Sequence, residues 1–78
     1  MTNEKIIASF LNGATTGSNK QGSLFIDGDT LYSYGRHYPL AQRLQDAVWV
    51  NSARYSNTTS KQASQVRSAV IRKGITLA

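Results

Sequence analysis

The sequence predicts an α+β domain in which a small antiparallel sheet of three to four strands packs against two helices, in the order α-β-β-β-β-α. Apolar residues near the N-terminus, and again over residues 58–74, recur with helical spacing. Between them, residues 23–51 hold short runs rich in β-branched and aromatic residues, separated by Gly, Pro and Asp. A length of 78 residues fits a single small domain, residues 1–78, with no Cys to form a disulfide.

The first helix is expected within "TNEKIIASFLNG", residues 2–13. Thr2 or Asn3 can cap it, Glu4 suits the positive end of the helix dipole, and Gly13 is a natural stop. Its apolar stripe consists of Ile6, Ile7, Phe10 and Leu11. A strand is the alternative, because the apolar run is short.

Residues 14–22 are polar and show no periodicity, so we expect a mobile loop there. The segment lacks the preceding strand and the Gly-Lys-Ser/Thr ending of a phosphate-binding loop. A plain connector is therefore the preferred interpretation.

The clearest local signal is "SLFIDGDTLYSY", residues 23–34, which predicts a β-hairpin. A two-residue type I′ turn at Asp27 and Gly28 would place Ile26 opposite Asp29. One face then carries the expected core residues Leu24, Ile26 and Leu31, and the other carries Phe25, Tyr32 and Tyr34. Because the second face is too aromatic for plain solvent, either a helix packs over part of it or it is a binding surface.

Two more strands are expected in "RHYPLAQRL" and "AVWVN", residues 36–44 and 47–51. Pro39 cannot donate to a ladder, so the first of them lies at an edge or begins after the proline. Leu40 and Leu44 are the expected core residues of the first of these strands. In the second, Val48 and Val50 share one face and Trp49 is on the other, and we favour a core position for Trp49.

The second helix is expected over "TTSKQASQVRSAVIRKG", residues 58–74. Thr59 and Gln62 have the spacing of a capping box, and Gly74 fits the position just after the helix. The buried stripe consists of Ala63, Val66, Ala69 and Val70. The last four residues, "ITLA", could add a final edge strand.

Net charge is +5 and is unevenly distributed along the chain. Residues 1–46 hold four basic and four acidic side chains, whereas residues 47–78 hold five basic and no acidic ones. A block of positive charge attracts polyanions, of which nucleic acid is the first candidate. Alternatively, the basic residues form a surface that only keeps the protein in solution.

One stretch, "LYSYGRHYPLA" at residues 31–41, combines three Tyr with the only His and the only Pro. We favour a structural role for His37, ahead of a ligand contact and of catalysis, because the acids needed to orient a base belong to expected turns. Tyr34 and Tyr38 border Gly35 and can either pack in a thin core or stack on nucleic-acid bases. No catalytic residue is expected, and one His without Cys does not indicate a metal site or a cofactor.

A second stretch, "YSNTTSK" at residues 55–61, places consecutive hydroxyls at the start of the second helix. An ordinary cap needs only one of them. Free amides and the helix dipole would favour an anion there, and the following Lys61 adds charge.

"GDTLYSYGRHYPLA" and "RYSNTTSKQASQVRSA" resemble the signature blocks of a small uncharacterised domain family of phages, archaeal viruses and prokaryotic mobile elements. The first block is carried by Asp29, Leu31, Ser33, Tyr34, Gly35, His37, Tyr38, Pro39, Leu40 and Ala41, and the second by Tyr55, Ser56, Thr58, Thr59, Ser60 and Lys61. The family commonly has a His before the Gln of the second block, where this chain has Lys61. The resemblance covers roughly residues 23–70 and implies a source rather than an activity.

These observations predict a non-enzymatic phage- or mobile-element-type accessory protein that binds nucleic acid. We expect a monomer or small homo-oligomer in the cytoplasm, which would be the cytoplasm of the host cell if the protein is viral. Its expected anion-binding residues are Arg36, Arg54, Thr58, Thr59, Ser60, Lys61 and Arg67, and its expected contact residues are Tyr34, His37 and Tyr38. The alternative is a small viral inhibitor or adaptor that docks on a host defence protein. A small-ligand binder around His37 comes third, and no membrane association is expected.

Overall fold

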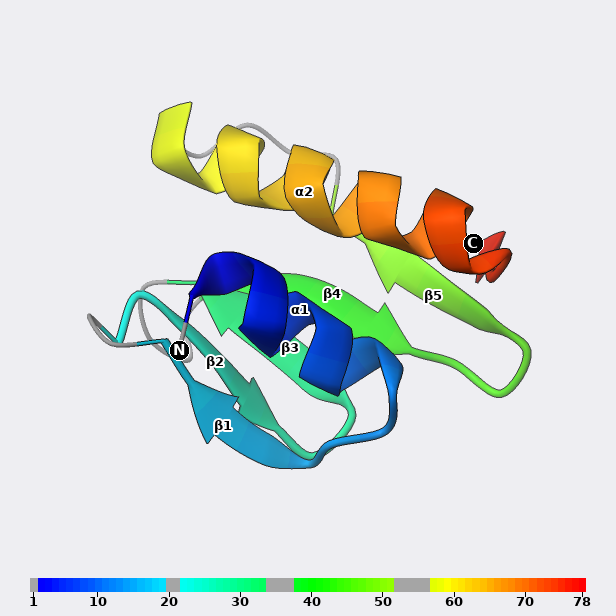
Figure 1. Cartoon of the computed structure of the whole chain (residues 1–78), viewed down its shortest axis with the longest axis horizontal. Coiled ribbons are helices and arrows are strands. Elements are labelled where there is room, and N and C mark those ends of the chain that lie inside the picture. The colour runs from blue at the N-terminus through cyan, green and yellow to red at the C-terminus, as the bar shows by residue number, and fades with distance from the viewer. Residues whose placement is uncertain (1, 20–21, 34–37, 52–56) are drawn as a thin grey trace.

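The computed structural model describes residues 2–19, 22–33, 38–51 and 57–78, the last range without the side chains of residues 57–59. Within these ranges, two helices and six strands follow in the order α-β-β-β-β-β-α-β. They are α1 (Asn3–Leu11), β1 (Thr16–Ser18), β2 (Leu24–Asp27), β3 (Thr30–Ser33), β4 (Pro39–Arg43), β5 (Ala47–Val50), α2 (Asn57–Lys73) and β6 (Thr76–Leu77). The strands form one sheet in sequence order, antiparallel except for the parallel pair β5 and β6. Both helices lie on the same face of this sheet (Figure 1).

The α+β class agrees with the sequence prediction, but the strand number and the element order were wrong. The sheet has six strands rather than three to four, and it is mixed rather than antiparallel. β1 lies inside the segment expected as a loop, where "TGS" has no apolar pattern to reveal it. A side chain at Gly17 would lie 3.7 Å from the Cδ1 atoms of both Ile6 and Ile26, so this strand packs on the core without an apolar residue of its own.

The β2–β3 hairpin forms, but its register is shifted from the predicted one. Asp27 pairs with Thr30, so the two turn residues are Gly28 and Asp29 rather than Asp27 and Gly28. Gly28 has a φ of 66°, which only glycine adopts at little cost, and it therefore takes the first turn position. The shift preserves the alternation of faces, so the predicted core set of Leu24, Ile26 and Leu31 is confirmed as buried.

β4 contains an irregularity that changes which of its residues are buried. The register between β3 and β4 shifts between Leu31 and Tyr32, so that Leu40 and Ala41 are both fully buried. Leu44, which was expected in the core, is 47% exposed, because the strand has ended and its N–H is bonded to Ala47 O in the turn.

Both helices stop at the predicted glycines. At the end of α2, Gly74 N–H donates to Ile71 O and Ile75 N–H donates to Val70 O, a Schellman arrangement around a φ of 75°. At the start of α1, Thr2 Oγ1 accepts from Lys5 N–H, as one of the two predicted caps.

The predicted capping box of α2 was wrong. The helix begins at Asn57, two residues before Thr59, and Gln62 is buried instead of reaching back to the helix start. In the predicted buried stripe of α2, the burial of Ala63, Val66 and Val70 is confirmed, whereas Ala69 is half-buried at the edge of the core. No helix among the described residues is long and apolar enough to cross a membrane.

Candidate nucleic-acid interface

The two unusual sequence blocks meet through one buried hydrogen bond. The Ser33 hydroxyl donates to Gln62 Oε1 at 2.6 Å, between residues 29 positions apart. Ser33 is fully buried and Gln62 is 2% exposed. Ser33 belongs to the "LYSYGRHYPLA" block, and Gln62 directly follows the "YSNTTSK" block, so the end of β3 is joined to the first part of α2.

Several described residues gather at this end of the sheet, which we call the motif end. Ser33 N–H donates to Tyr38 O at 3.0 Å, which closes the β3–β4 connection. Asn51, just after β5, donates through its backbone N–H to Leu40 O and through its side chain to Pro39 O. The β3–β4 connection, the end of β5 and the start of α2 therefore lie together.

Most of the predicted site residues fall outside the part of the chain that the structure describes. They are Tyr34, Arg36, His37 and Arg54, together with the side chains of Thr58 and Thr59. The described residues on either side of them in the chain lie at the motif end.

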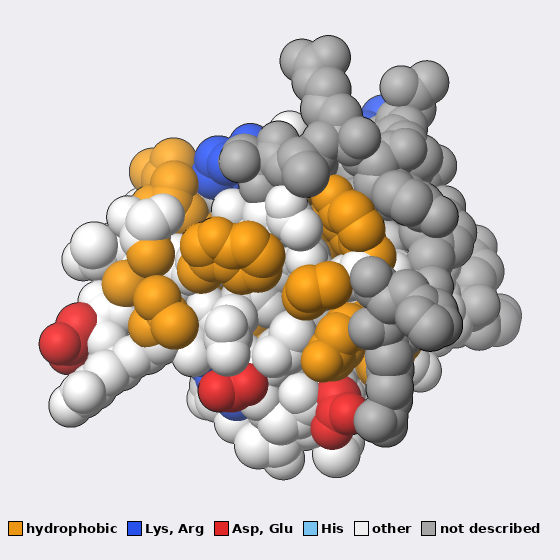
Figure 2. All heavy atoms as spheres, turned by 180° about the vertical axis from the view of Figure 1, so that it is seen from behind, with side chains coloured by type: hydrophobic (Ala, Val, Ile, Leu, Met, Phe, Trp, Pro, Cys, Tyr) orange, Lys and Arg blue, Asp and Glu red, His pale blue; other side chains and the backbone are white. Residues whose placement is uncertain are grey.

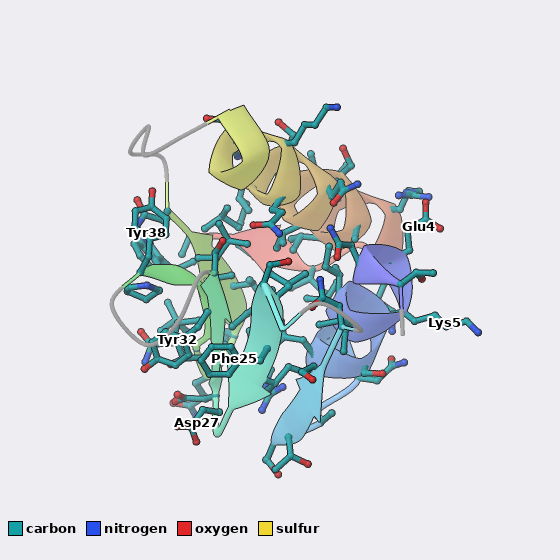
Figure 3. The ribbon with its side chains drawn as sticks, turned by 90° about the vertical axis from the view of Figure 1, so that its left-hand side faces the viewer. Glu4, Lys5, Phe25, Asp27, Tyr32 and Tyr38 are labelled. Atoms are coloured by element: carbon teal, nitrogen blue, oxygen red, sulfur yellow. The ribbon has the colours of Figure 1, made fainter. Side chains whose placement is uncertain are left out.

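The other predicted residues lie on two different layers. Ser60 and Lys61 are in the first part of α2, with Ser60 half-buried and Lys61 exposed, and Arg67 is half-buried farther along the same helix. Tyr38 is half-buried against the core. Tyr38, Tyr32 and Phe25 lie on the side of the sheet away from α1 (Figure 3). A ligand that touches both Lys61 and these rings must pass around the motif end.

No described element covers the sheet face opposite the helices, which we call the outer face. Hydrophobic side chains gather across the middle of this face, and acidic ones lie along its border (Figure 2). Of the two alternatives for this aromatic face, packing under a helix is therefore excluded for α1 and α2. Trp49, which was expected in the core, lies here half-buried, because its position in β5 alternates with buried Val48 and Val50.

The strand register arranges the outer face in rows. One row crosses four strands and consists of Ser18, Phe25, Tyr32 and Pro39, which we call the aromatic row. The Phe25 and Tyr32 rings stack with a centroid distance of 5.3 Å and an interplanar angle of 19°. The next row, farther from the motif end, consists of Thr16, Asp27, Thr30, Gln42 and Trp49.

Acidic residues concentrate at the opposite end of the sheet, which we call the turn end. Asp27 directly precedes the β2–β3 turn, Asp29 lies in it, Asp46 lies in the β4–β5 turn, and all three are exposed. The fourth acid of the chain, Glu4, is on α1. The arrangement follows from the antiparallel sheet, which places alternate connections at opposite ends.

Arg43 is an organising residue that the sequence reasoning missed. Its guanidinium donates to Phe10 O, Ala14 O and Gly28 O, and its Cζ lies 4.8 Å from the centre of the Phe10 ring. It thereby satisfies carbonyl groups in the last turn of α1, in the α1–β1 connection and in the β2–β3 turn. An Arg at the end of a predicted strand gave no sequence signal for this role.

The helix layer carries an open groove of about 470 Å³ between α1 and α2. Its floor includes Ile7, Leu11 and Ala69, and Arg72 lies at its rim. Within the described ranges, no three His, Cys, Asp or Glu side chains gather in a way that could hold a metal ion.

Comparison of the chain with protein-family models, with curated proteins and with solved structures finds no match. The resemblance to the phage and archaeal-virus domain family therefore stays a prediction from the two sequence blocks. Function is consequently inferred from the chemistry of the surfaces described above.

Proposed function

We propose that the protein is a non-enzymatic accessory protein, of the kind encoded by phages or mobile elements, that binds nucleic acid in the host cytoplasm. Phosphate groups are held by the basic residues of the motif end, and bases are held by aromatic rings. The proposal requires no cofactor.

The observation that carries the proposal is the charge of α2, which holds Lys61, Arg67, Arg72 and Lys73 and no acidic residue. Three of the four acidic residues, Asp27, Asp29 and Asp46, lie instead at the turn end of the sheet.

Lys61 and Arg67 lie on α2, which begins at the motif end. Lys61 is exposed near the start of α2. The other basic residues expected in the site, Arg36 and Arg54, lie outside the described residues. A surface with an excess of one sign attracts polyanions and raises their association rate.

The test is a binding panel of single- and double-stranded DNA and RNA oligonucleotides at about 50 and 200 mM salt. We expect the affinity to fall steeply with salt, because each bound phosphate releases counterions. Lys61→Glu should weaken binding and reduce the slope of log K against log salt by about 0.7–0.9 for each phosphate that the variant no longer binds.

Lys5→Glu is the matched control, since Lys5 is also exposed near the start of a helix and the change in net charge is the same. Its side chain extends from α1 on the opposite side of the molecule from Phe25 and Tyr32 (Figure 3). It should weaken binding less than Lys61→Glu. Absence of binding at the lower salt concentration, or an affinity that does not change with salt, would refute the proposal.

A second candidate is docking on a host protein, and the uncharged aromatic row favours it, because aromatic residues are enriched in protein interfaces. Capture from host lysate with and without nuclease separates the two functions. A single partner protein that is retained after nuclease treatment and no longer captured by Phe25→Ala would favour docking over nucleic-acid binding.

A further inference from the structure

We infer that the outer face is a stacking platform for single-stranded nucleic acid, with Phe25 and Tyr32 at its centre and Trp49 beside them. The inference rests on the proposed function and names its substrate class and its base-contacting residues. These residues differ from Tyr34 and Tyr38, to which the sequence reasoning assigned the stacking role.

The aromatic row has the dimensions and the chemistry of such a platform. It spans four strands, or about 14 Å at the usual strand spacing. Known sheet platforms of comparable width stack two or three bases. Its four members, Ser18, Phe25, Tyr32 and Pro39, carry no charge, and part of each remains exposed.

The pairing of the rings leaves a surface on which a base can stack. The rings of Phe25 and Tyr32 stack with their centroids 5.3 Å apart, so each ring restricts the motion of the other before a ligand binds. On the other side of Phe25 its strand partner is the small, exposed Ser18. Among the described residues, a base that approaches the Phe25 ring from the β1 edge therefore meets only this small side chain in the row.

Single strands fit this surface better than duplexes, because a duplex keeps the faces of its bases inside its own stack. Stacking on aromatic side chains tolerates all four bases, so the platform needs no hydrogen-bond code. Trp49, on β5, extends the aromatic area diagonally beyond Pro39.

The charges determine on which side of the row the phosphates run. Asp27 is two residues from Phe25 on the same strand and the same face, about 7 Å farther toward the turn end. That distance is within a Debye length at physiological salt, so a phosphate on that side is repelled. The backbone of a bound strand should therefore follow the motif-end side of the aromatic row.

The test compares a single-stranded homopolymeric oligonucleotide with its duplex, using wild-type protein, Phe25→Leu and Tyr32→Leu. Leu retains apolar area on the sheet but cannot stack. Loss of one stacked base should weaken single-strand binding roughly 5- to 150-fold in each variant. Trp49 is the only Trp of the chain, so quenching of its fluorescence by the single strand reports binding at this face directly.

Ile71→Ala is the control, because it removes an apolar side chain that is 66% exposed on α2, in the helix layer. It should leave the affinity for single strands unchanged. Circular dichroism shows whether each variant is folded. If a variant is not folded, quenching of Trp49 fluorescence in the wild-type protein serves as the test in its place.

The outcomes distinguish the platform from the proposed function. If single strands bind equally well to wild type and to both folded Leu variants, and Trp49 is not quenched, the platform is refuted while nucleic-acid binding stands. If no oligonucleotide binds, the proposed function fails and the platform with it. A dimer that is absent in Phe25→Leu and that excludes the oligonucleotide would assign the face to a second copy of the chain and overturn the inference.

Discussion

Replacing Ser33 with Ala is expected to lower the free energy of unfolding by about 1–3 kcal/mol, because it leaves the buried Oε1 of Gln62 without its donor. The hydroxyl is fully buried and the bond is 2.6 Å long, so water cannot readily replace it. A domain of 78 residues has a total stability of about 4–12 kcal/mol. The loss is therefore a large share of the total.

Urea unfolding measures the effect. With a slope of about 1.5 kcal/mol/M, the midpoint of Ser33→Ala should fall by about 0.7–2 M. Gln62→Leu should also lower the free energy of unfolding. In the double variant with both Ser33→Ala and Gln62→Leu, the decrease should be smaller than the sum of the two single decreases by about 0.5–1.5 kcal/mol, because replacing both partners leaves no unsatisfied group.

Two exposed residues supply the controls. Ser18→Ala on β1 and Gln65→Leu on α2 make the same chemical changes on exposed sites, and each should alter stability by less than about 0.5 kcal/mol. A decrease of less than about 0.5 kcal/mol for Ser33→Ala, or strictly additive effects in the cycle, would refute the claim that this bond joins the two sequence blocks.

Three further predictions concern residues that the structure places in defined roles. Arg43→Lys should lower the free energy of unfolding by about 1–3 kcal/mol in urea unfolding, because the single ammonium nitrogen of Lys cannot reach the three carbonyls that two guanidinium nitrogens of Arg43 contact. An unchanged midpoint would contradict this role. Gly28→Ala should cost about 1–2 kcal/mol by the same assay through its positive φ alone, since the space around it is open, and a stabilised variant would show that the turn is wrongly assigned. Asp27→Asn should raise the affinity for single strands about 1.5- to 3-fold at low salt, measured by Trp49 quenching, and a reduced affinity would place the phosphates elsewhere.

Alternation and helical spacing were sufficient to predict the core of the hairpin and of both helices. Leu24, Ile26 and Leu31 were assigned correctly even though the turn is displaced, because the displacement kept the same residues on the same face. Leu44 was assigned wrongly, since β4 ends at Arg43 and Leu44 lies in the turn, a boundary that the apolar spacing does not show. β1 is too short and too polar to be predicted from propensity, whereas β6 lies in the segment that the sequence allowed as a final edge strand.

The candidate site shows the same division between local and distant causes. That an aromatic face forms on the hairpin follows from the sequence alternation, and Phe25 and Tyr32 do share it. That Gln62 is buried depends on Ser33, which is 29 residues away, so the spacing of a capping box was misleading. That three acidic residues gather at the turn end depends on the strand order of the whole sheet.

The most direct test of the proposed nucleic-acid binding is the affinity of wild-type protein for a single-stranded oligonucleotide measured as a function of salt. We expect binding at about 50 mM salt, and a log K that falls linearly with log salt with a slope of about −0.7 for each bound phosphate. No binding at about 50 mM salt, or an affinity that is the same at about 200 mM, would contradict it.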